Sequence, residues 1–285
     1  MQWKTLGFRE IPQWPVCFPI NPEPETLIPF LLMKTDLSSP EIQSALAAYV
    51  AGHRPILTQA NPKLLKGNAA GWVTTGIHFA PAKISGRNVC PGATVACSDA
   101  CLYFSGHGAF TVTQVSRIAR TLYFHRHREK FMRQLEKEIA SFIKTAKRHG
   151  LIPAVRLNLT SDIPWENVKT DSGESLPEKF ESVQFYDYTK VASRMSRFLT
   201  GDFPGNYHLT FSRAETAQSE RLALSFLASG GNVAAVFRSL PELWNGFPVI
   251  DGDANDLTFL RPAGTVFGLR AKGPAKNDKS GFVIQ

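Results

Sequence analysis

The chain has 285 residues, of which 43% are hydrophobic and 20% are charged, so it can bury a large core in one domain of barrel size. No apolar run reaches the roughly 18 residues of a membrane span, and the start lacks a basic segment followed by an apolar one, which predicts a cytoplasmic protein with no membrane partner. The formal charge of +8 is compatible with a polyanionic partner such as nucleic acid.

The first 70 residues are rich in proline and predict an irregular N-terminal extension that packs on a core domain at 71–285. One short helix is expected in the extension at 40–51. Ser38 or Ser39 can cap its first turn, and Pro40 can begin it because proline needs no backbone N–H there.

The core domain is expected to alternate strands with helices. A strand at 73–79 leads into a loop interrupted by glycine and proline, and apolar residues then recur at helical spacing over 112–149, as one long helix or a broken pair. Further strands are expected at 154–159, 183–188, 207–211, 233–237, 248–250 and 266–270, with helices at 188–199 and 215–228. Strands with few polar residues indicate parallel pairing under a layer of helices. The sequence therefore predicts the α/β class and a complete or partial β/α barrel of the TIM type.

Three of the four cysteines lie in the loop after the first expected strand. Six residues separate Cys90 from Cys97, and three separate Cys97 from Cys101. Thiolates are the soft ligands that iron–sulfur clusters and zinc prefer, and a short loop can bring three of them to one centre. We expect an iron–sulfur cluster, with zinc as the alternative, since the paired CxxC knuckles typical of zinc sites are absent. The fourth ligand is Cys17, His107 or an exogenous group.

Polar residues follow several of the expected strands, where the reactive side chains of β/α barrels gather. These residues are Asn158, Ser161, Asp162, Asp187, Lys190, Ser212, Arg213, Glu215, Asp251, Asp253 and Asp256. Asp162, Asp187 and Arg213 are the expected catalytic residues. Asn158, Ser161 and Asp162 are expected to orient a cofactor or substrate. The same residue types cap helices and turns, so a structural role stays open.

A basic stretch lies within the expected helix at 112–149. It places Arg117, Arg120, Arg126, Arg128 and Arg133 among aromatic residues. Such arginines can contact nucleic-acid phosphates, but an amphipathic helix also shows a charged face to solvent. Near the C-terminus, Lys272 has the same two interpretations, an anion contact or a solvated lysine.

Six segments from about residue 74 to the C-terminus carry a resemblance to a known family. They read GIHFAPAKISGRNVCPGATVACSDACL, VRLNLTSDIPWE, VQFYDYTK, NYHLTFSRAE, GNVAAVF and VIDGDANDLTFLRPAGTVFGLRAKG. In combination they resemble the phage and plasmid family known as gene product 88. That family brings no assigned activity with it.

The order of a strand, a three-cysteine loop, a helix and a partial barrel is also similar, more distantly, to radical S-adenosylmethionine enzymes. In those enzymes three thiolates hold a [4Fe–4S] cluster whose fourth iron binds the cofactor, which implies S-adenosylmethionine here. Two features depart from that pattern. The cysteine spacing is wider than CxxxCxxC, and NLTSD at 158–162 stands where a Gly-Gly-Glu segment would follow the second strand.

Three functions follow from these features. The leading one is an iron–sulfur enzyme that modifies a nucleotide or nucleic acid. The second is a nucleic-acid-binding module without catalysis, in which zinc holds the loop. The third is a barrel that exchanges or hydrolyses a base, with Asp162 or Asp187 as nucleophile or general base.

Overall fold

The structure is a computed structural model that describes residues 35–58, residue 67 and residues 70–285. Residues 35–285 form one compact unit. The predictions made for residues 1–34, including Cys17 as a ligand, lie outside the described residues.

Nine strands of the described chain form one sheet in which almost all neighbours are parallel. They are β1 (Trp72–Gly76), β2 (Ile152–Arg156), β3 (Gln184–Thr189), β4 (Tyr207–Ser212), β5 (Asn232–Phe237), β6 (Leu243–Trp244), β7 (Phe247–Asp251), β8 (Val266–Arg270) and β9 (Val283–Ile284). The order is β1-β2-β3-β4-β5-β8-β7-β6, and β9 pairs in parallel with the end of β5. Of the pairings between two described strands, the β6–β7 hairpin alone is antiparallel.

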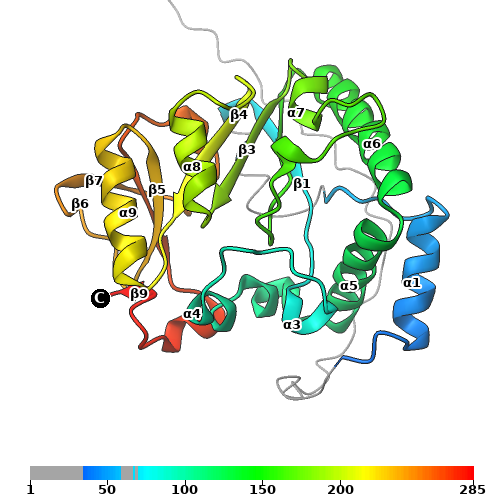
Figure 1. Cartoon of the computed structure of the whole chain (residues 1–285), viewed down its shortest axis with the longest axis horizontal. Coiled ribbons are helices and arrows are strands. Elements are labelled where there is room, and N and C mark those ends of the chain that lie inside the picture. The colour runs from blue at the N-terminus through cyan, green and yellow to red at the C-terminus, as the bar shows by residue number, and fades with distance from the viewer. Residues whose placement is uncertain (1–34, 59–66, 68–69) are drawn as a thin grey trace, which may run out of the picture. The chain divides into compact units, whose positions relative to one another are not determined.

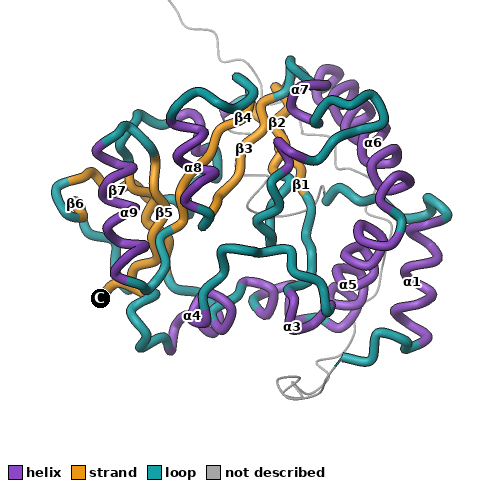
Figure 2. Tube along the Cα trace, viewed as in Figure 1, coloured by secondary structure: helices purple, strands orange, loops and turns teal. Residues whose placement is uncertain are grey.

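Helices join the consecutive strands from β1 to β5, as Figures 1 and 2 show. The helices are α1 (Pro40–Val50), α3 (Ala82–Ser85), α4 (Val95–Asp99), α5 (Thr111–Arg126), α6 (Arg128–Arg148), α7 (Leu176–Lys179), α8 (Ala192–Leu199) and α9 (Ala217–Ala228). The pair α5 and α6 connects β1 to β2, α8 connects β3 to β4, and α9 connects β4 to β5. In Figure 1, α8 and α9 cover one face of the sheet. No helix of the described part is long and apolar enough to cross a membrane.

The α/β class and the first five parallel strands are confirmed. The expected helix at 112–149 is the broken pair, because the backbone of His127 leaves helical geometry between α5 and α6. The complete barrel stays a prediction. Within the described strands no pairing joins β1 to β6 or β7, and β8 inserts between β5 and β7 instead of following β7 outward.

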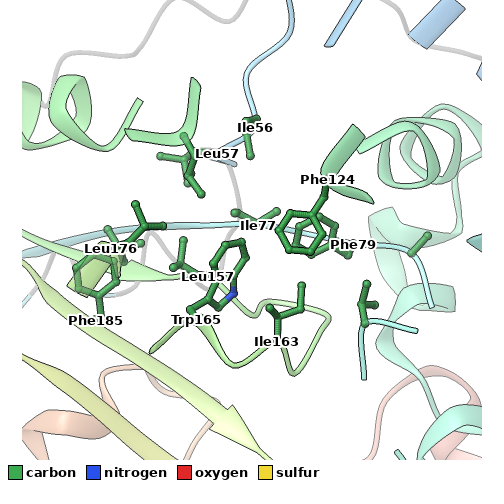
Figure 3. Close-up of a cluster of buried hydrophobic side chains, with 14 of the residues drawn as sticks. Ile56, Leu57, Ile77, Phe79, Phe124, Leu157, Ile163, Trp165, Leu176 and Phe185 are labelled. Atoms are coloured by element: carbon green, nitrogen blue, oxygen red, sulfur yellow. The ribbon is translucent and has the colours of Figure 1, made fainter. Parts of the chain in front are cut away.

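Aromatic and aliphatic side chains fill the core between the sheet and the helices (Figure 3). Trp165 and Phe79 are fully buried, and the ring of Phe124 from α5 lies 5.4 Å from Trp165 and 5.3 Å from Phe79. This packing anchors the segments that follow β1 and β2 beneath α5. Those two segments continue directly into the cysteine loop and into residues 158–163.

Candidate functional site

The cysteine loop runs along the edge of the sheet at which the parallel strands end (Figure 1). Cys90 Sγ lies 3.9 Å from the carbonyl oxygen of Thr160, which follows β2. Gly92 packs closely on Lys190 after β3, where a Cβ would approach within 3.0 Å. Thr94 Oγ1 donates a 2.7 Å hydrogen bond to the Glu215 carboxylate after β4. The loop therefore crosses the ends of three neighbouring strands.

The short helix α4 positions the second and third cysteines. Thr94 is its N-cap, and Thr94 Oγ1 accepts a 3.2 Å hydrogen bond from the backbone N–H of Cys97. Threonine is a preferred residue there because its oxygen satisfies a free helical N–H. Ser98 Oγ donates to the carbonyl oxygen of Thr94 at 2.8 Å. Cys97 thus lies within α4, and Cys101 follows its end.

The three thiols are free and partly buried, and they act on one another electrostatically. Burial raises the pKa of Cys90 to about 12, with further contributions from Cys101, Asp162 and Cys97. Burial also raises the pKa of Cys97 and of Cys101. These groups are therefore protonated thiols at neutral pH without a metal, and a metal would have to displace their protons.

Positive charges flank the thiols. Lys190 lowers the pKa of Cys97, and Arg117 and Lys83 lower the pKa of Cys101, in each case against the larger effect of burial. The half-buried Lys190 donates from Nζ to the carbonyl oxygens of Ser212 and Arg213 and to Ser212 Oγ at 3.0–3.2 Å. Its ammonium group is thereby held near Cys97. Fixed cations of this kind would offset the negative charge of a metal–thiolate centre.

Within the described residues, no group of three or more His, Cys, Asp and Glu side chains has the geometry of a metal site. The donor chemistry nevertheless fits a soft metal, because three thiols share one edge of the sheet and are flanked by cations. His107 is exposed in the 3₁₀ turn η3 (Gly106–Ala109), where its ring packs against Phe110. The other proposed protein ligand, Cys17, is outside the described residues.

Asn158 and Asp187, two predicted site residues, meet in a buried hydrogen-bond network. The Asp187 carboxylate accepts hydrogen bonds from the Asn158 backbone N–H at 2.8 Å, from Asn158 Nδ2 at 3.1 Å and from Tyr207 Oη at 2.7 Å. Burial raises the pKa of Asp187 to about 7, against the lowering effect of the Tyr207 hydroxyl. Ser161 Oγ joins the network by donating to Asn158 Oδ1 at 2.7 Å.

Asp162 lies beside this network and is tied to the next loop. Its carboxylate accepts a 2.7 Å ion-paired hydrogen bond from Arg194 and a 2.8 Å hydrogen bond from the backbone N–H of Lys190. Arg194 also pairs with the buried Glu166 at 2.8 Å. In addition, the Asp162 backbone N–H donates to the carbonyl oxygen of Val89, directly before Cys90. The predicted residues after β2 thus hold the first cysteine against the ends of β2 and β3.

Arg213 occupies a different place. Its guanidinium donates to the carbonyl oxygen of Gly281 at 2.6 Å and pairs with Glu220 of α9 at 2.8 Å. Arg213 therefore attaches the C-terminal segment to α9. The structure brings Asn158, Ser161, Asp162 and Asp187 together but does not bring the Arg213 guanidinium into their network.

The acidic residues after β7 are engaged in separate contacts. Asp251 pairs with Arg270 at 2.8 Å, and Asp253 pairs with Lys272 at 2.6 Å. Asp256 pairs with Arg156 and accepts a 3.0 Å hydrogen bond from Tyr188. Lys272 therefore forms an ion pair within the chain, with Asp253, where an external anion was one of the two expected partners. Tyr188 also lies on the opposite side of β3 from Asp187, as the strand period predicts.

Glu166, Arg194 and Tyr207 were not predicted from the sequence. An arginine in a short amphipathic helix is usually taken for a solvent-facing residue, so nothing in the sequence marked Arg194 as buried. Its two carboxylate partners come from a loop about 30 residues earlier, and only the packing of α8 against that loop joins them. The motif PWE contains Glu166 but gives no sign of its partner.

These features define a class: an α/β protein with a parallel sheet whose carboxyl edge carries a three-cysteine loop. The family model for gene product 88 matches residues 55–285, and the chain therefore belongs to that family. No match was found among curated proteins or among solved structures. None of these comparisons supports the more distant likeness to radical S-adenosylmethionine enzymes.

Proposed function

We propose that this protein is an iron–sulfur enzyme in which Cys90, Cys97 and Cys101 hold a [4Fe–4S] cluster and that its substrate is a nucleotide or nucleic acid. The observation that carries the proposal is the gathering of three free thiols, flanked by cations, at the carboxyl edge of the sheet. In this proposal the sheet is a partial barrel, and its carboxyl edge is the mouth at which substrate binds.

An iron–sulfur cluster suits this donor set better than zinc. A structural zinc site closes its tetrahedron with four protein ligands, whereas His107 is exposed and its ring packs against Phe110. Three thiolates leave one iron position for an exogenous ligand, for which the resemblance suggests S-adenosylmethionine. When bound, such a cluster supplies one-electron chemistry and an open coordination position.

The neighbouring polar residues have a defined part in the proposal. Asp162 and Asn158 hold the segment after β2, whose Thr160 and Asp162 backbones contact Cys90 and Val89. Lys190 supplies positive charge beside Cys97. Asp162 and Asp187 are proposed here as positioning residues, because both carboxylates already accept hydrogen bonds from the protein. Arg213 stays a predicted catalytic residue, although its contacts with Gly281 and Glu220 lie outside their network.

A nucleotide or nucleic-acid substrate is supported by charge. The whole chain carries a formal charge of +8. Arg126, Arg128 and Lys130 lie exposed where α5 meets α6 and can contact phosphates.

The test is a set of single cysteine variants purified without oxygen. Cys90→Ala, Cys97→Ala and Cys101→Ala should each abolish the broad visible absorption of the cluster and its iron and sulfide content. Ser98→Ala is the matched control because Ser98 lies in α4 between two of the cysteines, and this variant should keep the cluster. Retention of absorption in all three cysteine variants, or a colourless wild-type protein with one zinc per chain, would refute the iron–sulfur proposal.

A further inference from the structure

Arg117 of α5 is a buried cation whose guanidinium lies over the aromatic ring of Tyr103. Its relative exposure is 7%, yet its guanidinium makes no hydrogen bond or ion pair with any described residue, and Nη1 is fully enclosed. Arginine stays protonated in proteins, so the charge persists inside the fold. A buried charge left unpaired is strongly destabilising, which makes a missing counter-charge the expected explanation.

The neighbouring Arg120 shows what a satisfied arginine looks like in the same helix. It is equally buried, but its guanidinium donates to the carbonyl oxygen of His78 at 2.8 Å and to Tyr49 Oη at 2.7 Å. It connects α5 to α1 and to the segment after β1. Arg117 has no such connection, so its burial is not explained by a structural role of the kind that Arg120 has.

A second unpartnered donor lies beside Arg117. Tyr103, in the 3₁₀ turn η2 (Leu102–Phe104), is fully buried, and its hydroxyl has no hydrogen-bond partner in the described chain. The Arg117 guanidinium carbon lies 5.6 Å from the centre of the Tyr103 ring. Gly108 packs against the same guanidinium, where a Cβ would lie 2.9 Å from Nη1. Two donors and a close-packed glycine thus meet at one place.

Among the described residues, no carboxylate acts on the pKa of Arg117. The side chains that act on its pKa are Tyr103, Arg120 and Cys101, and burial lowers this pKa further. The missing negative charge would come either from a metal–thiolate centre at Cys101 or from an anion outside the chain, and the experiment below separates the two.

We propose that Arg117 and Tyr103 form an oxyanion-binding site between α5 and η2, next to Cys101, which takes a phosphate or carboxylate group of a small-molecule ligand. The planar guanidinium can bind two oxygens of such a group, and the phenolic O–H can donate to one of them. The site does not require a particular metal, and a metal–thiolate centre that itself neutralises Arg117 is the alternative that the experiment tests.

The site is tested by measuring anion binding to the full-length protein. Sodium phosphate and sodium acetate are titrated in separate arms against sodium chloride at constant ionic strength, with thermal unfolding and calorimetry as readouts. Phosphate stabilises many proteins nonspecifically, so specific binding is measured as the difference in response between wild type and the variants. The arm with the larger response identifies the preferred group.

Arg117→Met should weaken binding of the preferred anion by about tenfold or more, since it removes the charge-assisted hydrogen bonds. Tyr103→Phe should weaken binding less, because the aromatic ring remains. Arg197→Met is the matched control: Arg197 also lies over an aromatic ring, that of Phe203, but is partly exposed and pairs with Asp202, so binding should be unchanged. In chloride buffer Arg117→Met should be at least as stable as wild type, whereas a purely structural arginine would make this variant less stable.

Three results would overturn the proposal. The first is a wild-type protein that binds neither anion. The second is an Arg117→Met variant that binds the anion as well as wild type does. The third is binding that disappears when the cysteines carry metal, because the metal–thiolate centre would then be the counter-charge of Arg117. A wild-type protein that holds no iron–sulfur cluster but still binds the anion would refute the proposed function and leave the anion site intact.

Discussion

Asp187 shows how burial sets the chemistry of a single residue. It is 1% exposed, and its carboxylate accepts three hydrogen bonds from Asn158 and Tyr207. These hydrogen bonds favour the ionised form, but the loss of solvent outweighs them and raises the pKa to about 7. Asp187 therefore changes its charge close to neutral pH, within a network that supports the segment before Cys90.

Asp187 should make the free energy of unfolding depend on pH. The folded protein holds the Asp187 proton more tightly than the unfolded chain, whose pKa is 3.8. The stabilisation from this group is thus fully present below the unfolded pKa and is lost as pH rises towards about 7. The difference in free energy of unfolding between wild type and Asp187→Asn should fall over this range, by at most about 1.4 kcal/mol per pH unit.

Urea unfolding at several pH values measures this difference. Asp171→Asn, at an exposed carboxylate, is the control for general effects of pH on the protein. A difference between wild type and Asp187→Asn that stays constant with pH would contradict the prediction.

At the scale of elements, α4 controls the geometry of the cysteine loop. The helix is only five residues long, so its N-cap is a large part of its stability. Thr94 both caps α4 and donates to Glu215 after β4, and it therefore links the loop to the sheet. The position of Cys97 relative to Cys101 depends on this helix.

We expect Thr94→Ala to lower the free energy of unfolding by about 1 kcal/mol, the usual contribution of an N-cap. It should also weaken metal retention, measured as iron remaining after dialysis against a chelator. Thr216→Ala removes the equivalent cap of α9, where Thr216 Oγ1 accepts from the Ser219 N–H. That control should lose similar stability but keep its metal, and equal metal loss in both variants would contradict the role of α4.

The sequence predicted the extent of α5 and α6 but not which of their charged residues are buried. The apolar period predicted the extent of α5 and α6, and the break at His127 was one of the two expected forms. The same period suggested that the arginines form a solvated face. Arg117 and Arg120 are instead buried, because α1 and the turn at 102–109 cover that side of α5. Such coverage depends on tertiary packing that the period of one helix does not encode.

At the scale of the whole molecule, the parallel strands were predictable because each is a short apolar run between loop residues. Parallel pairing places the carboxyl ends of these strands at one edge of the sheet. Cys90, Asp162 and Lys190 therefore meet there although they are far apart in sequence. The insertion of β8 between β5 and β7 was not predictable, because strand order beyond the alternating units is decided by pairing in three dimensions. The same holds for Glu166 and Arg194.

The basic charge of the molecule leads to a prediction about nucleic acid. If the exposed cations at the α5–α6 junction contact phosphates, affinity for DNA or RNA should fall steeply as salt increases. Replacing Arg126, Arg128 and Lys130 together by glutamine should reduce the logarithmic salt slope by up to about 3, one for each lost phosphate contact. Fluorescence anisotropy over a range of salt concentrations measures the slope, and an unchanged slope would exclude this surface.

The proposed function depends most directly on which metal the cysteine loop binds. The decisive measurement is the iron, acid-labile sulfide and zinc content of wild-type protein purified without oxygen. We predict iron and sulfide in equal amounts, about one [4Fe–4S] cluster per chain, with little zinc. Stoichiometric zinc without sulfide would contradict the iron–sulfur account and point to a metal that only holds the loop in place.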